Sequence, residues 1–173
     1  MSKARLILNV GKRVVYPCQG PCLIGSIEKK IVNDRPMMFY QLVVLDDGGG
    51  KLFVPVEKAR AVGIRPLIKK IEISKLLDQL KKPSQSAEDY RQRARDNVKL
   101  FASGSAFDLA EIVESLTELS ETKSLSLGER KTLERAKRLL VCEISEVLRG
   151  TKEEAEQQID KALKARKENH KPY

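Results

Sequence analysis

The sequence predicts an α+β protein of two modules, a small antiparallel β-barrel followed by a bundle of four or five α-helices. Two observations support this fold class. Up to about residue 65, short runs rich in β-branched and aromatic residues alternate with turn residues, which is typical of strands. After about residue 70, apolar residues recur every three or four positions, which is the period of an amphipathic helix. The expected domains therefore span residues 8–66 and 71–165.

Four strands are expected in the first module. Residues 13–16 form a short β-branched run, and residues 22–32 lead into an Asn-Asp-Arg-Pro turn at residues 33–36. Residues 37–45 return toward a second turn, where two aspartates precede three glycines, and residues 51–56 form the last strand. Short strands with tight turns and no helix between them favour a closed or nearly closed barrel of SH3-like or Tudor-like geometry.

Five helices are expected in the second module, and local signals mark their ends. They cover residues 71–80, 86–103, 106–122, 126–150 and 151–163. Ser126 with Glu129, and Thr151 with Glu154, are capping-box pairs, in which each side chain satisfies a free backbone N–H of the first helical turn. The polar tail, residues 164–173, is expected to fray.

The chain carries a net charge of +9, which favours a nucleic acid or an acidic protein surface as partner. Residues 1–80 hold 14 Lys and Arg against 7 Asp and Glu, a net charge of +7. Residues 81–173 hold 19 against 17, a net charge of only +2. Three cysteines fit a reducing compartment, and no apolar run approaches the ~20 residues of a membrane span. A cytoplasmic protein with no membrane partner is expected.

The residues give little support to enzyme activity. The only histidine, His170, lies in the polar tail, so no Ser or Cys can pair with a histidine base. Cys18 and Cys22 lack the further ligands of a zinc site. The adjacent pair Asp46 and Asp47 precedes three glycines and is interpreted as a hairpin tip. No catalytic residue, metal or cofactor is predicted.

The second predicted helix carries the nucleic-acid signal. Arg91, Arg95 and Lys99 recur every four residues and share one face, with Arg93 and Asn97 beside it. This face could follow a phosphate backbone, although a solvated basic surface is the commoner meaning of such a pattern. A weaker basic patch starts at Arg130. Tyr90 belongs to an apolar stripe whose spacing alone favours burial in the core, and which continues through Ala94, Val98 and Phe101.

Several motifs together resemble the bacterial CarD/CdnL family of transcription regulators. In the first module they are VGKRVVYP at residues 10–17 with Gly20, FVPV at 53–56 and VGIR at 62–65. In the second they are Asn97 with KLFASG at 99–104, LSLGER at 125–130 and Ala136-Lys137. The resemblance covers residues 8 to 165. The first module is also similar to the polymerase-interaction module of transcription-repair coupling factors.

The resemblance implies a Tudor-like module that docks on the β subunit of RNA polymerase, through strand residues that correspond here to Lys30, Phe53 and Pro55. It implies a helical module that contacts promoter DNA at the upstream edge of the bubble and stabilises the open complex. The family's minor-groove wedge, usually Trp, aligns with Tyr90, and this chain contains no Trp. The DNA-binding set implied is Tyr90, Arg91, Arg93, Arg95, Asn97 and Arg130. No cofactor is implied, and association with the nucleoid would follow from polymerase binding.

Two other functions remain open at this stage. The near-neutral second module and the absent Trp suit an adaptor that binds polymerase without significant DNA contact. The charge of residues 1–80 suits a stand-alone nucleic-acid-binding barrel. Neither the target promoters nor the oligomeric state follows from the residues.

Overall fold

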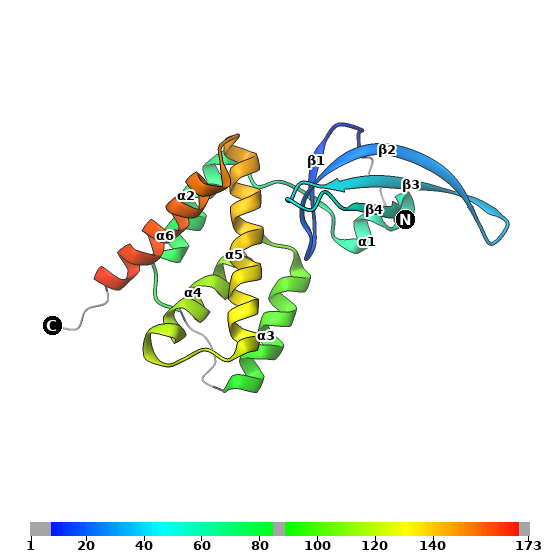
Figure 1. Cartoon of the computed structure of the whole chain (residues 1–173). Helices are drawn as coiled ribbons and strands as arrows, with labels where there is room; N and C mark the ends of the chain where they lie inside the picture. Colours follow the sequence, from blue (N-terminus) through cyan, green and yellow to red (C-terminus); the bar gives the residue numbers. More distant parts are fainter. Residues whose placement is uncertain (1–7, 85–88, 170–173) are drawn as a thin grey trace, which may run out of the picture. The chain divides into compact units, whose positions relative to one another are not determined.

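A computed structural model describes residues 8–84 and 89–169 of the chain. The backbone divides into two compact units, Met1–Leu67 and Ile68–Tyr173. Within the described residues, the first unit contains a five-stranded antiparallel sheet and the second contains five α-helices (Figure 1). The predicted α+β fold is confirmed.

The sheet of the first unit has the strand order β4-β3-β2-β1-β5. Its strands are β1 (Arg13–Tyr16), β2 (Gly20–Val32), β3 (Arg35–Val44), β4 (Lys51–Pro55) and β5 (Arg65–Pro66). The sequence did not predict β5, because this strand consists of only two residues, which pair with β1. A 3-10 turn, η1 (Val56–Lys58), and a single helical turn, α1 (Ala59–Val62), connect β4 to β5.

The turn between β2 and β3 is shorter than predicted. Only Asn33 and Asp34 form it, both with left-handed φ angles, 51° and 60°. Asn and Asp tolerate this backbone conformation, and it suits a two-residue hairpin. Arg35 and Pro36, expected in the turn, instead begin β3 and pair with Val32 and Ile31. The result is a long two-stranded arm.

One face of the sheet is buried and the other is open. Cys22, Ile24, Tyr40 and Leu42 pack on the buried face, which holds the core of this unit. A bulge at Gly25 shifts the register of β2 between Ile24 and Ser26. No pattern in the sequence predicts this bulge. It determines which β2 side chains lie on the open face beyond it.

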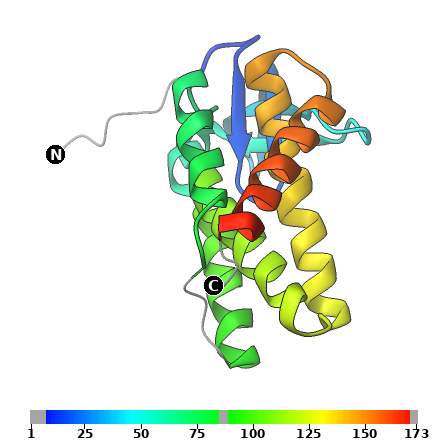
Figure 2. The ribbon, with the colours of Figure 1, turned by 90° about the vertical axis from the view of Figure 1, so that its left-hand side faces the viewer.

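The helical unit packs around α4 and α5. Its helices are α2 (Lys70–Leu80), α3 (Tyr90–Ser103), α4 (Ala106–Thr122), α5 (Leu127–Leu148) and α6 (Lys152–Asn169). Their buried leucine, isoleucine, valine and alanine side chains form one core cluster. Helices α2 and α6 lie side by side, as the second view shows (Figure 2). Residues 86–88, the predicted start of α3, lie outside the described residues, and the described helix begins after Asp89.

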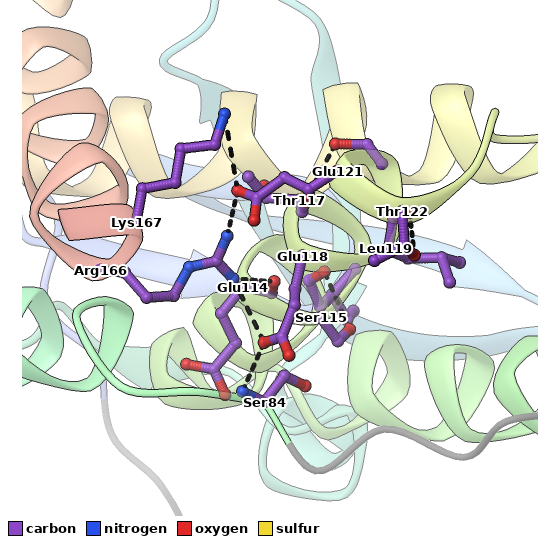
Figure 3. Close-up of polar contacts among 12 residues, drawn as sticks. Ser84, Glu114, Ser115, Thr117, Glu118, Leu119, Glu121, Thr122, Arg166 and Lys167 are labelled. Carbon is purple, nitrogen blue, oxygen red and sulfur yellow. Dashed lines mark hydrogen bonds and ion pairs between the residues drawn. The ribbon is translucent and has the colours of Figure 1, made fainter. Parts of the chain in front are cut away.

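The last helix is anchored by a buried arginine. Arg166 is 3% exposed, and its guanidinium donates to the backbone oxygen of Glu114, at 3.0 Å, and to Glu121, at 2.7 Å (Figure 3). Glu118 accepts from Arg166 and also, at 2.7 Å, from the backbone N–H of Ser84. The prediction that residues 164–173 fray is therefore wrong up to Asn169, where α6 ends. Residues 170–173 lie outside the described residues.

Candidate functional site

Helix α3 begins at a side-chain cap that leaves Tyr90 at the surface. Asp89 is the cap, and its carboxylate accepts a hydrogen bond from the backbone N–H of Gln92 at 3.1 Å. Tyr90 follows as the first helical residue and is 50% exposed. A Cβ atom placed on Gly128, in the first turn of α5, would lie 3.8 Å from the Tyr90 hydroxyl. The ring therefore lies next to the start of α5.

The predicted basic face of α3 exists at the surface. Arg91, Arg95 and Lys99 are all exposed, and their spacing of four residues keeps them on one side of the helix. These three cations can contact a line of phosphates, because their side chains are exposed to solvent.

Arg93 requires a correction to the predicted DNA-binding set. It is 4% exposed, and its Nη2 donates to Oε1 of Glu129 at 2.9 Å. An arginine two positions from Arg91 or Arg95 points to a different side of the helix. Arg93 therefore joins α3 to α5 and is not available to a phosphate at the surface.

Glu129 serves both helices at once. Its backbone N–H donates to Ser126 Oγ at 3.2 Å, and its Oε2 accepts from the backbone N–H of Ser126 at 3.0 Å, which is the predicted capping box. Its other oxygen accepts from Arg93. Burial raises the pKa of Glu129, but the hydrogen bonds from Arg93 and Ser126 outweigh it and lower the pKa below its ordinary value. The carboxylate stays ionised near neutral pH.

The apolar stripe of α3 does not enter the core as its spacing suggested. Tyr90 is 50% exposed and Val98 is 69% exposed, and Ala94 between them is exposed as well. Only Phe101, at the end of the stripe, packs against the core of the unit. The stripe forms one side of a groove of about 370 Å³ between α3 and the start of α5.

Asn97 and Arg130, the other predicted DNA contacts, lie on α3 and α5, the two helices that form this groove. Asn97 is half-buried and lines the groove from α3. Arg130 is exposed on the first turn of α5, next to Glu129. The opposite wall of the groove includes Lys131 and Arg135, and the Arg135 guanidinium carbon lies 5.2 Å from the centre of the Phe101 ring. Lys131 and Arg135 belong to the weaker basic patch that the sequence predicts from Arg130 onward, but only the packing of α5 beside α3 brings them to this groove.

The three predicted polymerase contacts come together on the open face of the sheet. Lys30 Nζ lies 3.5 Å from the centre of the Phe53 ring, a close cation–π contact, and 6.0 Å from that of Phe39. Phe53 is 44% exposed. Pro55 pairs with Phe39 across β4 and β3, so the two residues share a face. Phe39 was not among the predicted contacts, because only the strand register places it on this face.

Neither a metal-binding cluster nor a membrane-spanning helix is found in the described parts of the chain. Residues 8–84 and 89–169 hold no group of three or more His, Cys, Asp or Glu side chains placed to bind a metal ion. None of the helices in these ranges has the length and apolar character of a membrane span.

Comparison with known proteins identifies both units. Residues 8–68 match the family model for the CarD-like/TRCF RID domain, and residues 73–160 match the model for the CarD C-terminal domain. A proposed transcription factor of Bacillus subtilis (strain 168), YdeB, is 24% identical over 148 residues, which are 85% of this chain and 95% of YdeB. The solution NMR structure of the 72-residue N-terminal domain of Myxococcus xanthus CarD is 38% identical over 37% of this chain and 84% of that chain, with a TM-score of 0.30.

Proposed function

The chain belongs to the CarD family of transcription factors, and we propose that it binds the RNA polymerase β subunit, contacts promoter DNA at the upstream edge of the bubble and stabilises the open complex. The family consists of transcription factors and not of enzymes, which confirms the predicted absence of enzyme activity. The model matched by residues 8–68 describes an RNA polymerase-interacting domain, so the chain has a polymerase-related role in transcription. The choice of the β subunit and the promoter contact are our proposals.

The open face of the sheet supports the polymerase contact. Phe53 is an exposed aromatic side chain held by Lys30 on one side, and Pro55 and Phe39 extend the apolar surface beside it. Aromatic side chains surrounded by polar groups are typical anchors of protein interfaces. The net charge of +7 over residues 1–80 suits an acidic partner surface.

The observation that carries the DNA proposal is the exposed Tyr90 beside the basic face of α3. Arg91, Arg95 and Lys99 can bind phosphates, which would fix the position of the helix with little reading of the base sequence. The Tyr90 ring can then press on a base step from the minor groove, as apolar wedges do. A tyrosine is smaller than the tryptophan usual in the family and carries a hydroxyl, so we expect a weaker wedge. Asn97 and Arg130 complete the proposed contact.

The buried pair of Arg93 and Glu129 supports this contact from beneath. It fixes the first turn of α3 against the first turn of α5, so Tyr90 and Arg91 start from a defined position. A binding group that is already ordered loses less conformational entropy when its ligand arrives. Arg93 therefore contributes as a positioning residue.

The charge distribution favours one alternative, an adaptor that binds polymerase without meaningful DNA contact. Residues 81–173 carry a net charge of only +2. The two functions are separated by measuring the affinity of the chain for polymerase alone and for the polymerase–promoter open complex over a series of salt concentrations. A DNA contact gives tighter binding to the open complex and a steeper salt dependence. Equal affinities and equal slopes would instead establish the adaptor.

A further inference from the structure

We propose that the groove between α3 and the start of α5 binds one unpaired nucleotide of a DNA strand. The base would lie on the apolar stripe of α3, and the attached phosphate would lie on the neighbouring basic face. This inference deepens the proposed promoter contact and rests on it. It assigns a site to a base that leaves the stack, which the wedge alone does not provide.

The apolar stripe is the first support. Tyr90, Ala94 and Val98 follow one another at intervals of four residues, so they form a continuous strip along α3. Val98 is 69% exposed and Tyr90 50% exposed, although most large apolar side chains of this unit are buried. An apolar strip left open at the surface marks a surface that binds something.

The shape of the groove is the second support. Its volume of about 370 Å³ falls in the range of small-ligand sites, about 300–1,000 Å³. Tyr90 and Gly128 approach each other at one end, and Phe101 lies at the other with Arg135 beside its ring. Aromatic rings and arginine side chains are the surfaces on which unpaired bases stack. The side-chain amide of Asn97, within the groove, can hydrogen bond to a base edge.

Charge selects a nucleotide over an apolar protein segment. The groove is lined by Lys131 and Arg135 and by a third cation, Arg93, which is paired with the one lining carboxylate, Glu129. The groove therefore keeps an excess of positive charge. On a helix, Arg91 and Arg95 lie on the side of Val98 that is away from Tyr90, so the basic face and the apolar stripe run next to each other. A nucleotide has the same division, with an apolar ring next to an anionic phosphate. The complementarity therefore extends to both halves of the ligand.

The nucleotide must be unpaired. A base inside a duplex has both faces covered by its neighbours, and it reaches a protein pocket only after leaving the stack. The upstream edge of a promoter bubble is a place where paired DNA ends and such bases occur. The groove and the proposed wedge would therefore act on the same junction of paired and unpaired DNA, and Tyr90 belongs to both.

The test compares two DNA probes with the full chain at low ionic strength. One probe is a labelled duplex, and the other is the same duplex with a short unpaired stretch; fluorescence anisotropy gives the affinity for each. The quantity of interest is the ratio of the two affinities within one protein, because general charge effects cancel in it. We expect the wild type to prefer the unpaired probe by about tenfold, as for one stacked base.

Two single substitutions on α3 probe the groove. Val98→Glu places a carboxylate on the apolar stripe, and Gln92→Glu places one on the far side of the basic face, outside the groove. Both positions are exposed, so both variants should fold. We expect Val98→Glu to reduce the ratio of the two affinities to about one. Gln92→Glu should keep the ratio of the wild type while weakening binding to both probes by a similar factor.

The outcomes separate this inference from the function it rests on. Binding to neither probe would overturn the DNA contact and the groove together. Equal binding of both probes by the wild type would overturn the groove alone, and is the result expected if a protein segment or a second copy of the chain occupies it. A preference for the unpaired probe that survives Val98→Glu would also overturn it.

Discussion

The guanidinium of Arg93 and the carboxylate of Glu129 form a buried ion pair, 2.9 Å from Nη2 to Oε1, which joins the first turn of α3 to the first turn of α5. The side chains are 4% and 10% exposed. Removing one member of such a pair leaves a charge without its partner in a region of low polarity, which is costly. The pair therefore matters more for the geometry of the proposed DNA site than for direct contact with DNA.

Replacing Arg93 should destabilise the protein strongly. We expect Arg93→Met to lower the free energy of unfolding by about 3–5 kcal/mol, since it strands the Glu129 carboxylate. The matched control Arg91→Met, at an exposed position of the same helix, should change it by less than about 0.5 kcal/mol. Urea unfolding followed by circular dichroism measures both. Similar values for the two variants would contradict a structural role for Arg93.

The exposed arginines should behave in the opposite way. Replacing Arg91 and Arg95 together with Ala should leave stability unchanged but weaken promoter binding by the polymerase complex, because two phosphate contacts are lost. The slope of log affinity against log salt should fall by about one for each contact. Replacing the exposed Lys161 and Lys164 of α6 removes the same charge and should not change the slope. An equal effect of both double variants would show that only net charge matters.

The open face of the sheet can be tested at Phe53. Phe53→Ala removes the ring that Lys30 covers, and we expect it to weaken binding to the polymerase β subunit by about tenfold or more, as for an aromatic anchor. Ile31→Ala is the control, since Ile31 is 77% exposed and follows Lys30 on β2 but lies on the other face of the sheet. Pull-down and titration with the β subunit measure both. A larger loss for Ile31→Ala would move the contact to the other face.

Glu114 should make stability depend on pH near neutrality. Burial, with the nearby Glu111 carboxylate, raises its pKa to about 7 from an ordinary value of 4.5. A carboxyl group whose pKa is raised by folding stabilises the protein at low pH, and that contribution is lost as the pH rises from about 4.5 through about 7. Its Oε2 is buried without a hydrogen-bond partner, and the attraction of Arg166 and Lys82 offsets only part of the cost of ionisation.

Glu114→Gln should therefore raise the free energy of unfolding at pH 8 by about 1–3 kcal/mol relative to its effect at pH 5. Glu153→Gln, at an exposed position of α6, should have no such pH-dependent effect. Urea unfolding at the two pH values measures the difference. Glu129 has the opposite effect, because its pKa is lowered by folding. Its ionised carboxylate stabilises the protein at pH values above the ordinary pKa of a glutamate, and this contribution is lost as the pH falls. If the free energy of unfolding of Glu114→Gln changed with pH in the same way as that of the wild type, the raised pKa of Glu114 would be contradicted.

Much of the fold follows from short-range patterns in the sequence. The capping boxes at Ser126 and Thr151 mark helix starts within one turn, and their hydrogen bonds are present. The two aspartates before three glycines form a turn, in which Asp46 accepts from the backbone of Gly48 and Gly49. Such signals involve residues three or four positions apart, so the sequence alone contains them.

What the sequence could not predict depends on contacts between distant elements. Arg93 looks like one of a series of surface arginines, and only its partner 36 residues away buries it. The apolar stripe from Tyr90 to Val98 has the spacing of a core face, but the packing of α3 in the helical unit leaves both side chains exposed. Arg166 lies in a polar tail, yet it is fixed by α4. Each of these errors concerns a charged or apolar residue whose role a remote element decides.

The most direct test of the proposed function is the lifetime of the open complex formed with the wild-type chain, with Tyr90→Ala and with Tyr90→Trp. Because Tyr90 is 50% exposed, neither substitution should unfold the protein. If Tyr90 acts as a wedge at the edge of the bubble, the lifetime should be longest with Trp, intermediate with Tyr and shortest with Ala. Equal lifetimes for Tyr90→Ala and the wild type, with polymerase binding intact, would contradict the proposed promoter contact.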